Sequence, residues 1–194
     1  RIRGDLISFS EEGVLAPNTY SFDITTDKKD LYLKMRNNQA RILEAAWDKR
    51  DPDLPLKNAL ELLILASMVE KEAGNEEDKK KVASVFLNRL KKKMKLQSDP
   101  TVVYSLTKGR ESLNRELSRS DLKTKSPFNT YKIDGLPPSP ICNPSKSSIN
   151  AVANPLRTDF LFFVANGEGG HNFSKDLKQH NSFVKEYRRL KIEN

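Results

Sequence analysis

Two glutamates, Glu70 and Glu72, end a segment that is apolar around most of a helical circumference. This pattern predicts a helix buried inside a domain, and Gly74 predicts its C-terminal end. Burial and the negative end of the helix dipole both disfavour a carboxylate, so both raise a carboxyl pKa. A carboxyl group that stays protonated near neutral pH can act as a general acid. The apolar positions are Leu60, Leu62, Leu63, Ile64, Leu65, Ala66, Met68 and Val69.

The two glutamates cannot both face one site, because residues two apart on a helix point roughly 200° from one another. Each lies on a largely apolar stripe of the helix, so periodicity does not choose between them. A simpler interpretation is that both are solvated residues at a helix end, one of them paired with Lys71 or a nearby lysine. A perturbed carboxylate marks a functional site only in a statistical sense.

A second catalytic carboxylate is harder to find. A glycosidase that uses two carboxylates needs the second acid across the sugar ring from the first. The candidates are Asp99 and Asp134, but Asp99 directly precedes Pro100, where aspartates commonly begin turns. The sequence therefore offers one good acid and no convincing second. One carboxylate is enough for a reaction in which the substrate brings its own nucleophile.

The remaining reactive side chains are two histidines and one cysteine. His171 and His180 have no matching acid cluster, so we expect no metal site and no cofactor. His171 follows Gly169-Gly170, a turn that a ligand could approach closely, and it could donate or accept a hydrogen bond there. A nucleophilic pair of Cys142 with His180 is not expected, since nothing nearby would activate the thiol.

The charge balance points to an anionic partner. The 194 residues carry a formal charge of +8, with a pI of about 9.5. Nucleic acid, a membrane surface and an acidic cell-wall polymer all remain open on charge alone. No basic-aromatic motif for nucleic acid is recognisable, and no apolar run is long enough to cross a bilayer. The chain begins at Arg1 without a methionine and is expected to be a piece of a longer protein.

The hydrophobic pattern predicts an α+β fold, mostly helical, with one small β-hairpin. The stretch after residue 97 is expected to consist of loops and short elements marked by proline turns. Residues 160–165 are expected to form a buried strand that pairs with residues 171–173. Helices are expected at about 29–49, 57–73, 76–94 and 145–153, and from a cap at Ser174 to about 190.

Several blocks occur in an order that resembles the endolytic murein transglycosylase family, the MltG or YceG-like proteins. The resemblance covers nearly the whole chain, and six blocks in register are hard to obtain by chance. It is supported at its N-terminal end by residues 12–20 (EGVLAPNTY). The six blocks are 66–72 (ASMVEKE), 82–90 (VASVFLNRL), 96–102 (LQSDPTV), 126–131 (SPFNTY), 135–138 (GLPP) and 170–173 (GHNF).

The resemblance implies an enzyme that cuts peptidoglycan glycan strands between N-acetylmuramic acid and N-acetylglucosamine and leaves 1,6-anhydromuramoyl ends. It implies that Glu72 is the catalytic acid and that Glu70 is a supporting residue. Without the resemblance, a lysozyme-like hydrolase and a non-catalytic basic wall-binding module are the alternatives. The substrate-binding candidates, from their motif positions and hydrogen-bonding groups, are Gln97, Asp99, Asn129, Tyr131 and His171.

The resemblance also implies an organisation. Residues 1–55 are expected to be a helical lead-in segment, and residues 56–194 a lysozyme-like catalytic domain whose hairpin lines a substrate groove. Glycan strands are the expected substrate, and peptidoglycan synthases are the implied protein partners. The family carries an N-terminal membrane helix, so the implied location is the extracytoplasmic face of the bacterial cell membrane.

Overall fold

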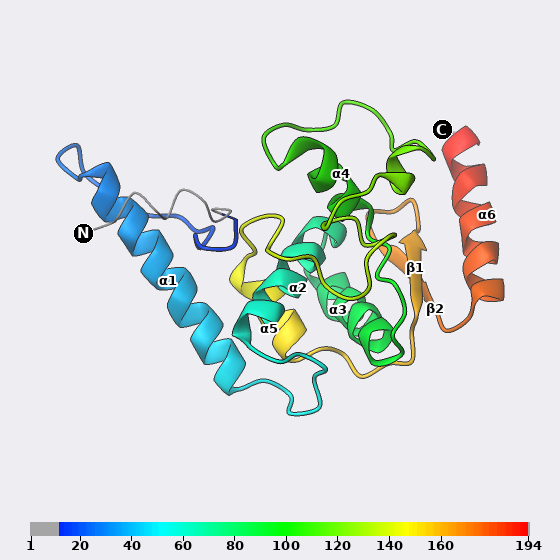
Figure 1. The fold of residues 1–194 in the computed structure, drawn as a ribbon, viewed down its shortest axis with the longest axis horizontal. Helices are drawn as coiled ribbons and strands as arrows, with labels where there is room; N and C mark the ends of the chain where they lie inside the picture. The colour runs from blue at the N-terminus through cyan, green and yellow to red at the C-terminus, as the bar shows by residue number, and fades with distance from the viewer. Residues whose placement is uncertain (1–11, 194) are drawn as a thin grey trace.

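The apolar segment before the two glutamates forms helix α2 (Ala59–Glu72), which lies at the centre of the fold (Figure 1). Asn58 begins the helix, since its side-chain oxygen accepts a hydrogen bond from the backbone N–H of Glu61 at 3.0 Å. Every residue from Leu62 to Val69 is buried. The helix ends at Glu72, two residues before Gly74, so the predicted buried helix is confirmed.

A computed structural model describes residues 12–193. The α+β class, mostly helical with one small hairpin, is confirmed. None of the helices in the described residues has the length and hydropathy that a membrane span requires. The other elements are α1 (Lys28–Asp48), α3 (Glu76–Lys91), α4 (Asp99–Thr107), the 3-10 helix η2 (Asp121–Lys123), α5 (Lys146–Ala153), β1 (Phe162–Ala165), β2 (His171–Ser174) and α6 (Leu177–Glu193).

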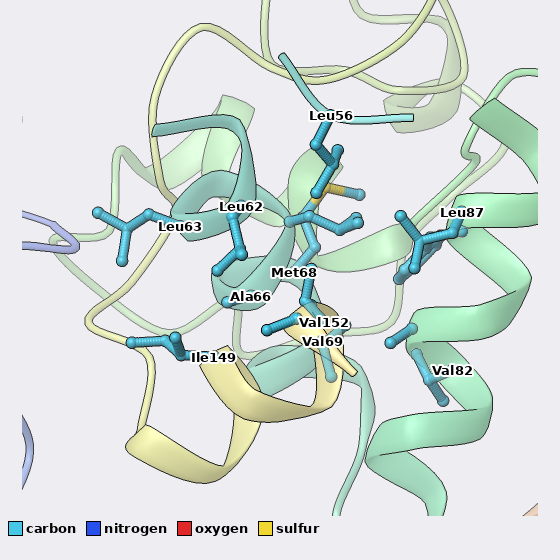
Figure 2. Close-up of a cluster of buried hydrophobic side chains, with 14 of the residues drawn as sticks. Leu56, Leu62, Leu63, Ala66, Met68, Val69, Val82, Leu87, Ile149 and Val152 are labelled. Atoms are coloured by element: carbon cyan, nitrogen blue, oxygen red, sulfur yellow. The ribbon is translucent and has the colours of Figure 1, made fainter. Parts of the chain in front are cut away.

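The core forms where α2 packs against α1, α3, α4 and α5. Figure 2 shows side chains of α2, α3 and α5 that meet in this core, among them Met68, Val82 and Val152. These three side chains are fully buried. Burying a side chain of this size stabilises a fold by roughly 1.5–3 kcal/mol. The core therefore holds the C-terminal end of α2, and the glutamates on it, in a fixed place.

The hairpin lies between two helices. β1 and β2 are antiparallel, with Phe163 opposite Phe173. Because side chains alternate along a strand, Phe163 and Phe162 point to opposite faces. Phe163 meets Phe86 of α3 edge-on, with ring centroids 5.8 Å apart. Phe162 stacks on His180 of α6 at 5.2 Å.

The sequence missed one helix and misplaced the start of another. Asp99–Thr107 forms helix α4 in the stretch where the sequence predicted loops and short elements, and Pro100 is tolerated there because it stands in the first turn, where its missing N–H costs nothing. The last helix begins at Leu177 and not at Ser174, which pairs with Phe162 in the hairpin. Asp176 caps that helix instead, and its carboxylate accepts a hydrogen bond from the N–H of Gln179 at 2.9 Å.

Candidate active site

Glu72 is the last residue of α2, and its half-buried carboxyl group faces a cleft. The hydroxyl of Ser98 donates a hydrogen bond to Glu72 Oε1 at 2.7 Å. Burial raises the pKa of Glu72 to about 7, and the nearby Asp99 adds to the rise, although Ser98 and the charge of Arg89 oppose it. A large fraction of Glu72 is therefore protonated at neutral pH, as a proton donor requires.

The cleft beside Glu72 has a volume of about 470 Å³ and is lined by elements from distant parts of the chain. The hairpin contributes residues 162–165 of β1 and His171 of β2 to the lining. Other polar groups come from Gln97 before α4, from Asp99 at its start and from Tyr131 in the loop after η2. The polar and charged residues that line the cleft are Glu72, Arg89, Gln97, Asp99, Tyr131, His171 and His180. Of the predicted site residues, only Asn129 and Glu70 are missing from this lining.

Asp99 and Tyr131 form a pair at the cleft. The phenol of Tyr131 donates a hydrogen bond to Asp99 Oδ1 at 2.6 Å. Burial raises the pKa of Tyr131, and the hydrogen bond to Asp99 raises it further. Tyr131 therefore stays a neutral hydrogen-bond donor at physiological pH. Asp99 is exposed, and its negative charge helps to keep the proton on Glu72.

Gln97 lines the cleft and has an unusual backbone conformation. Its φ is +51°, in the left-handed region that few residues other than glycine adopt. Its backbone N–H donates to the carbonyl of Thr130 at 3.2 Å, and its side-chain oxygen accepts from Arg89 at 3.3 Å. The side chain is exposed, so its amide can bind a ligand from the cleft.

Asn129 does not reach the cleft. It is fully buried, and its side-chain amide donates to the carbonyls of Leu122 and Thr124 at 3.2 and 2.8 Å. Its side-chain oxygen accepts from the N–H of Tyr131 at 3.0 Å. The geometry favours a supporting role, in which Asn129 shapes the loop that presents Tyr131.

Glu70 points to the N-terminus of α5. Its carboxylate accepts hydrogen bonds from the N–H of Ser145 at 3.1 Å and from the hydroxyls of Ser145 and Ser148, and Lys79 lies 3.8 Å away. Burial alone would raise the pKa of Glu70, but these hydrogen bonds and the lysine bring it below its usual value. Glu70 is therefore a charged anchor for α5, in a site that differs from that of Glu72.

The two histidines line the cleft in different surroundings. His171 Nδ1 lies 2.9 Å from the carboxylate of Asp78, the buried acid in the first turn of α3. His180 stacks on Phe162, and burial lowers its pKa, with the charge of Arg89 adding to the effect. Its Nδ1 has no hydrogen-bond partner among residues 12–193. No group of three metal-ligating side chains gathers in that same range.

Cys142 lies away from both histidines. Its thiol donates to the carbonyl of Ser67 at 3.3 Å, and burial raises its pKa to about 12. At neutral pH the sulfur is protonated and is a poor nucleophile. It lines a second cleft, which shares the lining residue Asp99 with the first.

Sequence reasoning did not single out Ser98, Arg89 or His180 for this site. Arg89 carried a usable signal, because it lies seven residues after Val82 and three after Phe86, on the apolar stripe of α3. A charged residue on such a stripe is buried only when its hydrogen bonds are satisfied. Ser98 lies in the stretch before Pro100 that was expected to form a turn, and no local pattern indicates its contact with Glu72.

Comparisons with known proteins give a consistent result. The profile of the YceG-like family matches residues 3–186. The chain is 40% identical over 180 residues to the endolytic murein transglycosylase of Bacillus subtilis, covering 91% of the chain and 48% of that protein. It is 34% identical to the protein of that name from Streptococcus pneumoniae (strain R6), covering 93% and 33%.

A solved structure agrees with these matches. The crystal structure of a yceG-like protein from Listeria monocytogenes superposes with a TM-score of 0.75 at 38% identity. The match covers 88% of the chain and 54% of that structure. The chain thus spans about half or less of the length of each of these relatives.

Proposed function

The chain belongs to the YceG-like family, and on that premise we propose that it is an endolytic lytic transglycosylase acting on peptidoglycan. The proposed cleavage lies between N-acetylmuramic acid and N-acetylglucosamine and leaves a 1,6-anhydromuramoyl end. One observation carries the proposal: of the two carboxyl groups that line the cleft, Glu72 has its pKa raised to about 7, whereas Asp99 is exposed and accepts the hydrogen bond of Tyr131. The names of the two relatives supply the substrate class.

The proposed reaction needs one protein carboxyl group. Glu72 donates its proton to the glycosidic oxygen while the bond from that oxygen to C1 of the muramoyl residue breaks. The resulting carboxylate then removes the proton from the C6 hydroxyl of the same sugar, whose oxygen bonds to C1. Glu72 thereby regains its proton, and no water is consumed.

The surrounding residues suit this chemistry. Asp99 favours the protonated acid, while Ser98 stabilises the carboxylate that forms midway, so Glu72 can alternate between its two states. We propose that Gln97 and Tyr131 hold the sugars and their N-acetyl groups, with Asp99 orienting Tyr131 and His171 at the edge of the site. We also propose action at the extracytoplasmic face of the membrane, beside peptidoglycan synthases.

Product mass distinguishes this reaction from hydrolysis of the same bond. Digestion of purified glycan strands is expected to yield fragments whose new ends are lighter by one water, because the C6 hydroxyl replaces water as the nucleophile. Mass spectrometry of the fragments checks this. Fragments with only reducing ends would support a lysozyme-like hydrolase, and intact strands would support a non-catalytic wall-binding module.

Replacing Ser98 with alanine is expected to shift the pH dependence of cleavage. The Ser98 hydroxyl stabilises the carboxylate form of Glu72, so its loss raises the pKa of Glu72 above its present value of about 7. The alkaline limb of the kcat/KM profile should move to higher pH, while kcat falls about tenfold because the carboxyl group is less well oriented.

The pH profile separates this role from a purely structural one. Ser98→Thr keeps a hydroxyl and is expected to retain an alkaline limb close to that of the unchanged chain. An alanine variant whose limb stays at the original pH would mean that the hydrogen bond to Glu72 does not govern its titration.

A further inference from the structure

A second cleft adjoins the catalytic one. Its volume is about 820 Å³, larger than that of the cleft beside Glu72, and Asp99 lines both. Lys71, the neighbour of Glu72 in sequence, lines this cleft together with residues 109–113 of the segment after α4. A polymer bound at Glu72 therefore has a further hollow beside it, which shares Asp99 with the catalytic cleft.

The lining of the second cleft is charged in both senses. Lys71, Arg110 and Arg115 supply the positive groups, and Glu12, Asp99 and Glu111 supply the negative ones. The side chains of Lys71, Arg110 and Glu111 are exposed. Neither Lys71 nor Arg110 forms an ion pair with any residue in the described range 12–193. In contrast, Arg115 in the same cleft is held by Asp121, with Nη2 and Oδ1 3.0 Å apart. Two cations are thus available to a ligand.

The chemistry of the polymer suggests what those cations meet. The glycan backbone of peptidoglycan is uncharged, whereas the short peptide on each muramoyl residue carries carboxylates and an amine. An uncharged sugar gains little from exposed lysine or arginine groups, but a carboxylate forms strong charge-assisted hydrogen bonds with them. The peptide branches from the muramoyl sugar, whose C1 bond is the one that breaks. It must therefore leave the catalytic cleft close to Glu72.

We propose that the second cleft binds the stem peptide of a muramoyl residue, with Lys71 and Arg110 receiving its carboxylates. This inference rests on the proposed function, since it takes peptidoglycan as the substrate. Glu111 provides a partner for the amine of the peptide. The enzyme would then read the peptide as well as the sugar, and it would prefer strands that still carry their peptides over stripped strands.

Binding tests this inference separately from turnover. The probe is a soluble glycan strand in two forms, one with its stem peptides and one from which an amidase has removed them. Because the amidase leaves a lactyl carboxylate on each muramoyl residue, these carboxylates are converted to methyl amides so that the stripped strand is uncharged. Each is titrated calorimetrically into the full chain carrying Glu72→Gln, whose turnover is expected to be too low to consume the probe during the titration. We expect the peptide-bearing strand to bind about tenfold more tightly, and Arg110→Gln added to that variant to remove most of the difference.

A matched control has the same net charge as the Arg110→Gln variant. Lys34→Gln on the exposed face of α1 removes one positive charge far from both clefts and is expected to leave the ratio of the two affinities unchanged. Equal binding of the two strands, or binding of neither, would overturn the inference, as would a ratio that Arg110→Gln leaves intact. If the ratio behaves as expected but the unchanged chain cleaves neither strand, the proposed function fails and the peptide site stands.

Discussion

Replacing Glu72 with glutamine is expected to lower the turnover of purified glycan strands by about a thousandfold. Glutamine keeps the size of the side chain and can still accept the hydrogen bond from Ser98, but it has no proton to give to the glycosidic oxygen. The same substitution removes the base that the second half of the reaction needs. Release of soluble fragments, followed by chromatography against time, measures the loss.

Glu70→Gln is the matched control, because it makes the same chemical change two residues away. Its carboxylate is bound to the N-terminus of α5 and does not line the cleft. We expect turnover within a few-fold of the unchanged chain, together with a lower free energy of unfolding, since α5 loses a charged anchor. Full activity in Glu72→Gln and loss in Glu70→Gln would reverse the assignment of the two glutamates.

The free energy of unfolding of Glu72→Gln, measured against pH, shows whether the variant folds normally. The pKa of Glu72 is higher in the folded chain than the usual value of 4.5, so the folded state holds the proton more tightly than the unfolded state. Stability from this group is therefore present at low pH and is lost as pH rises through about 7. Glutamine has no such titration, so the variant should lose less stability than the unchanged chain between pH 5 and pH 8.

The sequence could predict the buried helix and the hairpin, because both depend on local hydrophobic pattern. A run of apolar residues that ends in glutamates predicts a buried helix such as α2 without any knowledge of its tertiary surroundings. Periodicity could not choose between Glu70 and Glu72, since each lies on an apolar stripe. The two carboxylates differ through partners distant in sequence: Ser98 for one, and Ser145 with Ser148 for the other.

The other site residues show the same limit. Asn129 has the groups that bind sugars, but its amide is used by backbone carbonyls of the preceding loop, and no local pattern reveals that burial. Tyr131 and Asp99 are 32 residues apart, and they meet only because the loop of Tyr131 lies against the start of α4. Helix α4 was missed because Asp99-Pro100 is as typical of a turn as of a first helical turn.

Arg89 holds the walls of the cleft together, and its loss is expected to have the largest effect on stability. It is almost fully buried on α3. Nε donates to the carbonyl of Leu161 before β1 at 2.7 Å, and Nη1 donates to the carbonyl of Leu96 at 2.9 Å. The guanidinium also lies over the ring of Phe162, 5.2 Å from its centre. One side chain thus joins α3, the Gln97 segment and the hairpin.

Arg89→Met is therefore expected to lower the free energy of unfolding by about 3 kcal/mol, because buried carbonyls lose their donors while the packing volume is nearly kept. For a domain of this size, that corresponds to a fall in Tm of roughly 6–12 °C. Urea unfolding followed by circular dichroism measures the first quantity, and a thermal scan the second. Arg89→Lys should recover only part of the loss, since one ammonium group cannot reach the carbonyls of both Leu161 and Leu96, as the planar guanidinium does.

The same substitution is expected to change the chemistry of Glu72. The positive charge of Arg89 lowers the pKa of that carboxyl group, so its removal raises the pKa and moves the alkaline limb of the activity profile to higher pH. Arg89→Lys keeps the charge and should leave the limb nearly in place, although it weakens the fold. If methionine and lysine at position 89 give the same limb, the guanidinium acts on the cleft through its hydrogen bonds alone. If Arg89→Met is as stable as the unchanged chain, the buried carbonyls of Leu161 and Leu96 do not depend on it.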